Sequence, residues 1–266
     1  MNYWTRLSVE FANQKNYLDS LFRVYPMSIN IRREIKEDKW NKIENSFINK
    51  DNEVLIRELL KLELFPIKDS YVAYLKRDSS SIDRNPNTIN RLAGALYEMG
   101  LDNIYERCSE PKETNRQIGP LFKRWINSGS LGAPVFDNVD LFLQEQGNAV
   151  LSTSDAEMEK FARKYLGYNH EKGLDFVARF NNKYIIGEAK FLTDFGGHQD
   201  AQFADAISTI NSVLKPNKLS VEVIKIAICD GVLYIKGNNK MHKYLINNED
   251  KIVISSLLLR DFLYSI

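Results

Sequence analysis

The sequence predicts an α/β (α+β) protein in which a mixed β-sheet flanked by helices follows a large helical N-terminal region. In the first half, apolar residues recur at helical spacing, as in Tyr3–Tyr25. From residue 149 onward, short apolar and β-branched segments are interleaved with helical patterns, the order expected of a sheet covered by helices. A cluster of glycine, serine and proline at Ser128–Pro134 separates the two halves. We therefore expect two regions, residues 1–134 and 135–266.

Composition and charge show no strong bias toward any class of partner. Of the 266 residues, 44% are hydrophobic and 27% are charged, which is typical of a globular chain with a sizeable core. The formal net charge is +1, so the overall balance does not by itself indicate nucleic-acid binding. No apolar run is long enough to span a membrane, and Cys108 and Cys229 fit no metal-binding spacing. We expect a cytoplasmic protein with reduced thiols and no membrane partner, and the lack of a P-loop motif predicts no use of ATP.

The N-terminal region is expected to consist of short helices. Helical patterns cover Tyr3–Tyr25, Ile31–Ile48, Asn52–Leu64, Asp69–Arg77 and Asn87–Met99, and Gly100 is a typical residue for ending the last of these. The plain interpretation is that these helices simply pack together. Polar, basic loops such as the one that contains Arg84 are also compatible with a helix-turn-helix-like DNA reader. Dimerisation is a further alternative for the region.

A polar and basic stretch, Ser109–Trp125, is the next candidate for a nucleic-acid contact. Arginine and glutamine are able to pair with base edges, and lysine and arginine neutralise phosphates. The candidate residues are Arg116, Gln117, Lys123 and Arg124. An amphipathic helix whose apolar residues pack inward would explain the same pattern, and one helix could serve both purposes.

The C-terminal half contains the expected strands and one well-marked helix. That helix is Ser154–Leu166, where Ser154 and Glu157 form a capping box. A second helix is expected at Gln199–Leu214, with Gln199, Gln202 and Asp205 away from its apolar stripe and nearer the expected cleft. Asp230-Gly231 indicates a hairpin turn. Besides the central hairpin, we expect strands at Val139–Leu143, Ala149–Leu151, Val221–Cys229, Val232–Lys236, Lys240–Leu245 and Ile252–Ile254, and a final helix at Ser255–Leu263.

The most informative stretch is a hairpin that places charged residues inside an apolar strand. Gly173–Phe180 and Tyr184–Phe191 read as strands joined by Asn181-Asn182, since asparagine tolerates the positive φ of a tight turn. The second strand carries Glu188 and Lys190 on one face, and the hairpin brings Asp175 beside them. Buried charges are costly unless they are paired or bind a metal. Two carboxylates suit Mg²⁺, and a neighbouring lysine suits phosphodiester hydrolysis, although a cross-strand salt bridge would also account for the charges.

The spacing D-x12-E-A-K in this hairpin resembles the core of the PD-(D/E)xK nuclease superfamily, which includes the type II restriction endonucleases. The resemblance implies that Asp175 and Glu188 are metal ligands and that Asp175, Glu188 and Lys190 are catalytic. Leu174 stands where the family has proline, a position that varies. The resemblance also suggests that an acidic residue on the preceding helix, Glu157 or Glu159, is a further metal ligand. Polar residues on the following helix, here Gln199 and Gln202, are candidate DNA contacts.

This resemblance makes a type II restriction endonuclease the leading hypothesis. Such an enzyme would cut double-stranded DNA at a short sequence with Mg²⁺, and a palindromic site would imply a homodimer. Residues 1–134 would serve DNA recognition or dimerisation, and residues 135–266 would be catalytic. The alternatives are a repair, recombination or structure-specific nuclease with the same core, a non-catalytic DNA-binding protein, and an α/β domain with no nucleic-acid role.

Overall fold

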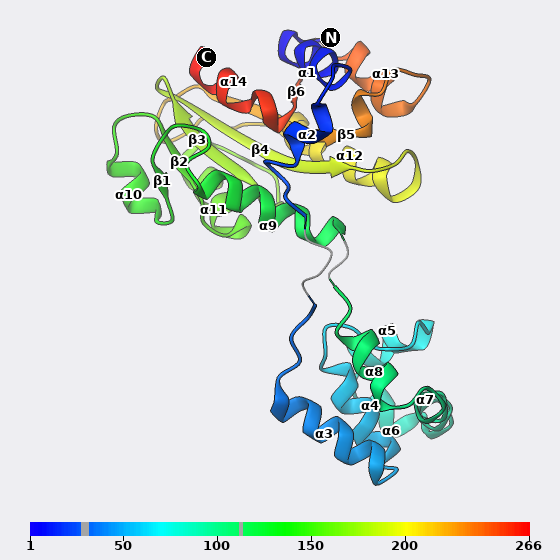
Figure 1. Cartoon of the computed structure of the whole chain (residues 1–266). Coiled ribbons are helices and arrows are strands. Elements are labelled where there is room, and N and C mark those ends of the chain that lie inside the picture. The colour runs from blue at the N-terminus through cyan, green and yellow to red at the C-terminus, as the bar shows by residue number, and fades with distance from the viewer. Residues whose placement is uncertain (28–31, 112–113) are drawn as a thin grey trace. The chain divides into compact units, whose positions relative to one another are not determined.

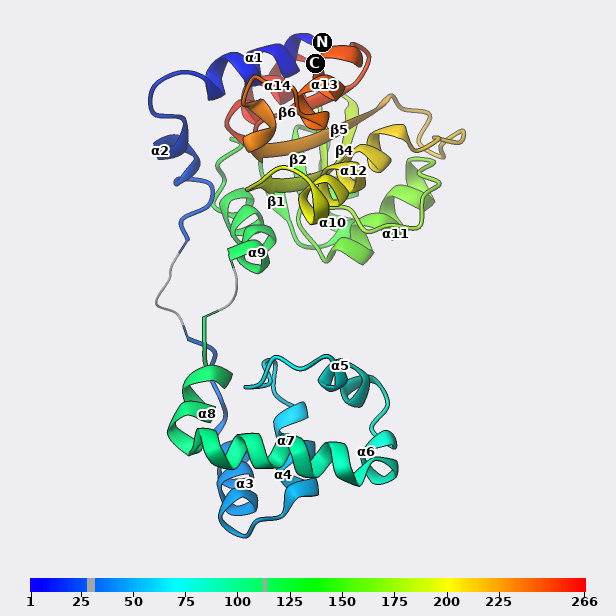
Figure 2. The same ribbon diagram turned by 90° about the vertical axis from the view of Figure 1, so that its right-hand side faces the viewer.

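The computed structural model of the chain describes residues 1–27, 32–111 and 114–266, and of residues 114–116 only the backbone. Contacts divide the chain into two compact units (Figures 1 and 2). One unit, here called the sheet unit, consists of residues 1–27 and 114–266. The other, here called the helical unit, consists of residues 28–113. No helix in the described part of the chain is long and apolar enough to cross a membrane.

The sheet unit is built around a mixed sheet, as the sequence predicts. Within the described residues the sheet has six strands, which lie side by side in chain order. The pairs β2–β3 and β3–β4 are antiparallel, and the other neighbouring pairs are parallel. The strands are β1 (Val135–Phe136), β2 (Ala149–Leu151), β3 (Phe176–Phe180), β4 (Lys183–Leu192), β5 (Val223–Gly231) and β6 (Ile252–Ile254).

Helices cover both faces of this sheet (Figures 1 and 2). Alternating side chains of β3 enter different cores: Phe176 and Ala178 pack in the larger core, and Val177 packs in the smaller one. The helices of the unit are α1 (Tyr3–Ala12), α2 (Tyr17–Leu21), α9 (Thr114–Asn127), α10 (Val139–Gln144), α11 (Asp155–Tyr165), α12 (Gly197–Asn211), α13 (Lys240–Asn247) and α14 (Leu259–Ser265), with 3₁₀ turns η1 (Val232–Tyr234) and η2 (Ser256–Leu258). Helices α9 and α12 pack on β4, and α11 packs on β3.

The central hairpin has the predicted form. Asn181 and Asn182 adopt φ values of 49° and 63°, which a tight turn between twisted strands requires. At the other end of the hairpin, Gly187 lies so close to β5 that a Cβ there would come within 2.9 Å of the Ile226 backbone oxygen. The turn fixes which residues of β3 and β4 face one another, and the glycine brings β4 close against β5.

The helical unit has an apolar core of its own, centred on residues such as Leu55, Leu59 and Leu92. Gly100 has a φ of 79° at the end of α7, as predicted. The unit contains α3 (Glu37–Ile48), α4 (Asn52–Leu60), α5 (Ser70–Arg77), α6 (Ser81–Arg84), α7 (Pro86–Met99) and α8 (Leu101–Cys108).

Three expected strands and one expected turn are wrong. Val139–Leu143 lies in α10, because the Asn138 side chain accepts hydrogen bonds from the Asp140 and Leu141 backbone nitrogens and starts a helix. Lys240–Leu245 lies in α13, capped in the same way by Asn239. Val232–Lys236 contains η1 instead of a strand. No hairpin turn forms at Asp230-Gly231, since both residues belong to β5.

The chain also divides at other points than the expected boundary at residue 134. Helix α9, which precedes that boundary, packs on β4, and α1 packs on β6, so both belong with the sheet. Tyr3–Tyr25 is two helices instead of one, separated at Asn16, which has a φ of 70°. The expected role of residues 1–134 in DNA recognition or dimerisation remains a prediction.

Candidate active site

The hairpin brings Asp175, Glu188 and Lys190 together at one end of the sheet. Asp175 lies just before β3, where its backbone nitrogen donates to the Gly187 carbonyl at 3.1 Å. Its Oδ2 accepts a hydrogen bond of 2.9 Å from the Ala189 backbone nitrogen. The Lys190 Nζ lies 3.8 Å from this same Oδ2. The three side chains named in the sequence motif therefore share one small site, and the backbone of β4 holds the aspartate in place.

Glu188 is the most buried of the three, with only 4% of the residue exposed. Its Oε1 accepts a hydrogen bond of 2.5 Å from the Lys190 Nζ. Its Oε2 is buried and has no hydrogen-bond partner among the described residues. A buried carboxylate oxygen without a partner is costly, so it is expected to have a ligand in the working protein.

The pKa values of Asp175 and Lys190 are both raised, but for different reasons. Burial raises the pKa of Asp175 to about 7, and the nearby Glu188 adds to the rise, while Lys190 and the Ala189 N–H oppose it. For Lys190, burial lowers the pKa, but the negative charges of Glu188 and Asp175 outweigh burial and raise it. The site therefore favours positive charge, which is the condition for holding a cation.

Two further residues complete the cluster: Asp205, expected from the sequence to face the cleft, and Lys172, which the sequence did not single out. The Lys172 Nζ lies 3.2 Å from Glu188 Oε1 and 2.8 Å from Asp205 Oδ1. Asp205, on α12, also has its Oδ2 3.7 Å from the Lys190 Nζ. Lys172 lies in the connection between α11 and β3, three residues before Asp175, and no motif marks such a position. Asp205 follows Gln202 by one helical turn and lies on the polar side of α12, as expected from the sequence.

A cavity of about 310 Å³ opens beside these charges. It is lined by Ile118, Gly119, Asp175, Ala189, Lys190, Phe191, Gln202 and Asp205. A second cavity of about 300 Å³ also reaches Asp175, and its lining includes Gly119, Lys123 and Asp155. The middle of α9 thus borders both spaces. Asp175 is accessible from either cavity, so a substrate lying along α9 would reach the charged cluster.

The two glutamates proposed as additional metal ligands have other contacts in the structure. Glu157 completes the predicted capping box, in which its Oε2 accepts from the Ser154 backbone nitrogen at 3.2 Å. Glu159 pairs with Arg163 one turn along α11, with 3.2 Å between Oε1 and Nη1. Within the described residues, no group of three or more His, Cys, Asp or Glu side chains is placed to hold a metal ion.

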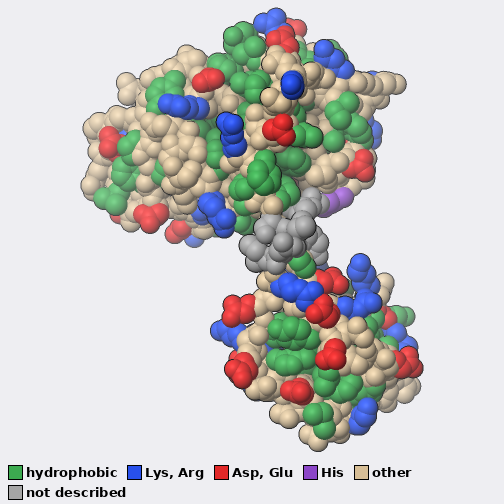
Figure 3. All heavy atoms as spheres, viewed as in Figure 1, with side chains coloured by type: hydrophobic (Ala, Val, Ile, Leu, Met, Phe, Trp, Pro, Cys, Tyr) green, Lys and Arg blue, Asp and Glu red, His purple; other side chains and the backbone are tan. Residues whose placement is uncertain are grey.

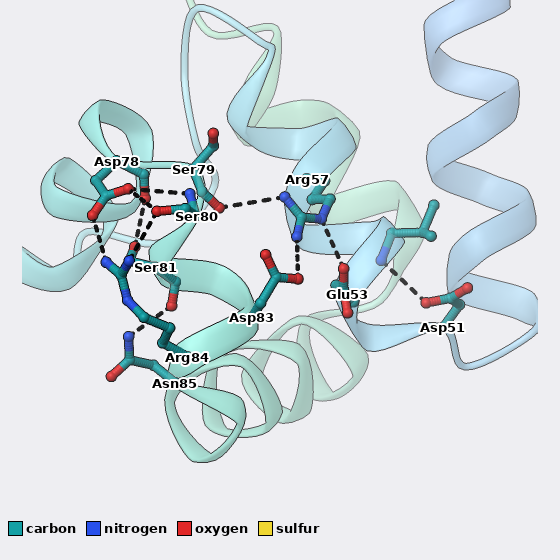
Figure 4. A network of polar contacts seen from close by, with 11 residues as sticks. Asp51, Glu53, Arg57, Asp78, Ser79, Ser80, Ser81, Asp83, Arg84 and Asn85 are labelled. Atoms are coloured by element: carbon teal, nitrogen blue, oxygen red, sulfur yellow. Dashed lines mark hydrogen bonds and ion pairs between the residues drawn. The ribbon is translucent and has the colours of Figure 1, made fainter.

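The candidate DNA-binding residues are dispersed between the two units. Arg84 belongs to the helical unit and pairs with Asp78, 2.7 Å away, in the polar network of Figure 4. Gln202 lines the first cavity and lies 2.9 Å from His198. Gln199 is buried, and its side-chain oxygen accepts from the Thr193 backbone nitrogen at 3.1 Å.

The remaining candidates lie on α9. Lys123 lines the second cavity and donates to the Thr153 carbonyl. Arg124 is exposed, and Gln117 is half-buried. The side chain of Arg116 lies outside the described part of the structure. Four of the candidates therefore lie on α9, the helix that borders the charged cluster.

Asp175 and Glu188 fit a divalent cation. Mg²⁺ is commonly held by one or two carboxylates, with water and phosphate oxygens completing its coordination. Two carboxylates, one with a buried oxygen that lacks a partner within the described residues, match that donor set. Lys190 is close enough to both to offset part of their negative charge when no cation is bound.

Comparison with known proteins identifies a family for the chain. No curated protein and no solved structure matches the chain. The model of one protein family, described as Tsp45I type II restriction enzyme, matches residues 2–266. Restriction enzymes act on DNA and typically require a divalent metal ion. Because this match covers nearly its whole length, the chain belongs to the Tsp45I family of type II restriction enzymes.

Proposed function

We propose that this restriction enzyme hydrolyses phosphodiester bonds of double-stranded DNA at a site formed by Asp175, Glu188 and Lys190, with Mg²⁺ held by the two carboxylates. The observation that carries the proposal is the buried Glu188 Oε2, which lacks a partner in the described part of the chain although the Asp175 carboxylate and the Lys190 amine lie beside it. When bound there, the metal would polarise the phosphate and favour deprotonation of the attacking water.

The protein's own groups prepare the site in three ways. The Ala189 N–H fixes the Asp175 carboxylate by a 2.9 Å hydrogen bond. Burial keeps water away from Glu188, which strengthens its attraction for a cation. Lys190 carries its positive charge at the mouth of the cavity, where it would hold the scissile phosphate or stabilise the charge that develops on it.

We further propose that α9 and the helical unit contact the DNA and that the enzyme acts as a homodimer on a palindromic sequence. Gln202 at the cavity and the exposed Arg124 on α9 support a contact near the cut. The visible face of the helical unit carries basic and acidic side chains side by side (Figure 3). A surface of mixed charge favours base-edge contacts by a few side chains over broad electrostatic binding.

The test is digestion of a long duplex DNA of mixed sequence with and without Mg²⁺. We expect discrete fragments from the wild-type protein, none with EDTA, and none from Lys190→Ala. Lys183→Ala is the matched control, because Lys183 lies on the same strand and pairs with Glu222 away from the site. A smear of fragments would contradict site-specific cutting, and full activity of Lys190→Ala would refute the assignment of Lys190.

A further inference from the structure

Lys172 contacts the same oxygen of Glu188 that Lys190 contacts. Its Nζ lies 3.2 Å from Glu188 Oε1, and its side chain is 18% exposed. Asp205 holds this lysine through two separate atoms: Oδ1 lies 2.8 Å from Nζ, and the backbone carbonyl accepts a hydrogen bond of 2.8 Å. Lys172 is thus fixed from α12 on one side and binds Glu188 on the other.

Lys190 has a different task in the proposed reaction, and that task competes with its present contact. Its ammonium lies 2.5 Å from Glu188 Oε1, so the carboxylate now sets its position, although two of its three N–H donors point elsewhere. A shift of Lys190 toward a bound phosphate would lengthen or break its contact with Glu188. A buried carboxylate that loses its partner is strongly destabilised unless another cation stays with it. Lys172 is placed to remain paired with Glu188.

The charge balance of the cluster also supports separate roles for Lys172 and Lys190. With all three carboxylates ionised, Asp175, Glu188 and Asp205 face two lysines, which leaves one net negative charge. Once Lys190 turns toward the substrate, the cluster carries two net negative charges, which a divalent cation would balance. If Lys172 turned away as well, one cation could no longer neutralise the three carboxylates.

We propose that Lys172, anchored by Asp205, is the lasting counter-ion and positioning residue of Glu188, and that it frees Lys190 to act on the phosphodiester. The proposal rests on the function proposed above. It assigns different roles to two lysines that contact one carboxylate oxygen: Lys172 keeps Glu188 charged and oriented, and Lys190 acts at the substrate.

The first test is thermal unfolding in EDTA, which needs neither DNA nor metal. Either lysine alone still pairs with Glu188. We therefore expect Lys172→Met and Lys190→Met each to lower Tm by only about 3 °C. The double variant leaves the buried carboxylate unpaired and is expected to lose about 10 °C, more than the two single losses together. Adding Glu188→Gln to the double variant should restore most of that loss. Additive losses would overturn the proposal, because they would mean that Lys172 serves the fold without serving Glu188.

The second test is single-turnover cleavage of a long duplex DNA with Mg²⁺. We expect Lys172→Met to slow cleavage by about 10- to 100-fold with little change in DNA affinity measured in Ca²⁺. Lys172→Arg should recover most of the rate, and the control Lys183→Met should match the wild type. A wild-type rate for Lys172→Met would overturn the proposal. A wild-type protein that cut no DNA would instead refute the proposed function, while the unfolding data would still decide whether Lys172 pairs with Glu188.

Discussion

Replacing Asp175 by asparagine should stabilise the metal-free protein at alkaline pH. The pKa of this carboxyl is raised from 3.8 to about 7 by burial and by Glu188. The unfolded chain therefore releases this proton at lower pH than the folded protein does, and stability falls as the pH rises through that interval. A difference of one in pKa between the folded and unfolded chain corresponds to about 1.36 kcal/mol. Above pH 7, the stability gained by removing this charge is therefore at most about 4 kcal/mol. Since the side chain is 23% exposed, we expect about 2–3 kcal/mol.

Urea unfolding in EDTA measures this effect directly. The asparagine oxygen still accepts from the Ala189 N–H, so Asp175→Asn removes the charge and keeps the hydrogen bond. We expect its stability advantage over wild type to grow by about 2 kcal/mol between about pH 5 and pH 8. Asp261→Asn, at an exposed carboxylate on α14, is the control and should show no such growth. An advantage for Asp175→Asn that does not change with pH, or a loss of stability at pH 8, would refute the reasoning.

Three further predictions concern the metal, the strand packing and the capping glutamate. Mg²⁺ at 100 times its Kd should stabilise the wild-type protein by about 2.7 kcal/mol, and Glu188→Gln should abolish that gain in thermal unfolding; an unchanged gain would remove Glu188 from the metal site. Gly187→Ala should cost about 1–3 kcal/mol in urea unfolding, because the new Cβ would meet Ile226 at 2.9 Å; wild-type stability would show that β5 shifts freely. Glu157→Ala should lower the midpoint of urea unfolding and leave Mn²⁺ affinity in calorimetry unchanged, since Glu157 serves the capping box; weaker Mn²⁺ binding would make it a ligand.

Local signals in the sequence were sufficient wherever a few neighbouring residues determine the conformation. Asn181-Asn182 forms the expected turn because positive φ is a property of those two residues. Ser154 and Glu157 form the expected capping box because both partners lie within one helical turn. The hairpin and its motif followed from the same kind of local pattern, and with them the meeting of Asp175, Glu188 and Lys190.

Short windows were less informative, because a few apolar residues within five or six positions fit a buried strand and a short helix equally well. Val139–Leu143 and Lys240–Leu245 became helices owing to the caps that precede them. The glycine-rich loop at Ser128–Pro134 resembled a boundary, but whether α9 packs with the helices before it or with the sheet after it depends on contacts distant in sequence.

Asp230 shows most clearly what such distant contacts decide. The Asp230-Gly231 pair indicates a turn when its neighbours alone are considered, yet Asp230 is fully buried in β5. Its carboxylate accepts from Tyr25 Oη at 3.1 Å and from Ser255 Oγ at 2.5 Å, donors that lie 205 and 25 residues away in the chain. Burial raises the pKa of this carboxyl, although these hydrogen bonds oppose the rise. A buried acid of this kind ties the N-terminal segment to the sheet, so the segment folds with the proposed catalytic residues even though its sequence predicts only a helix.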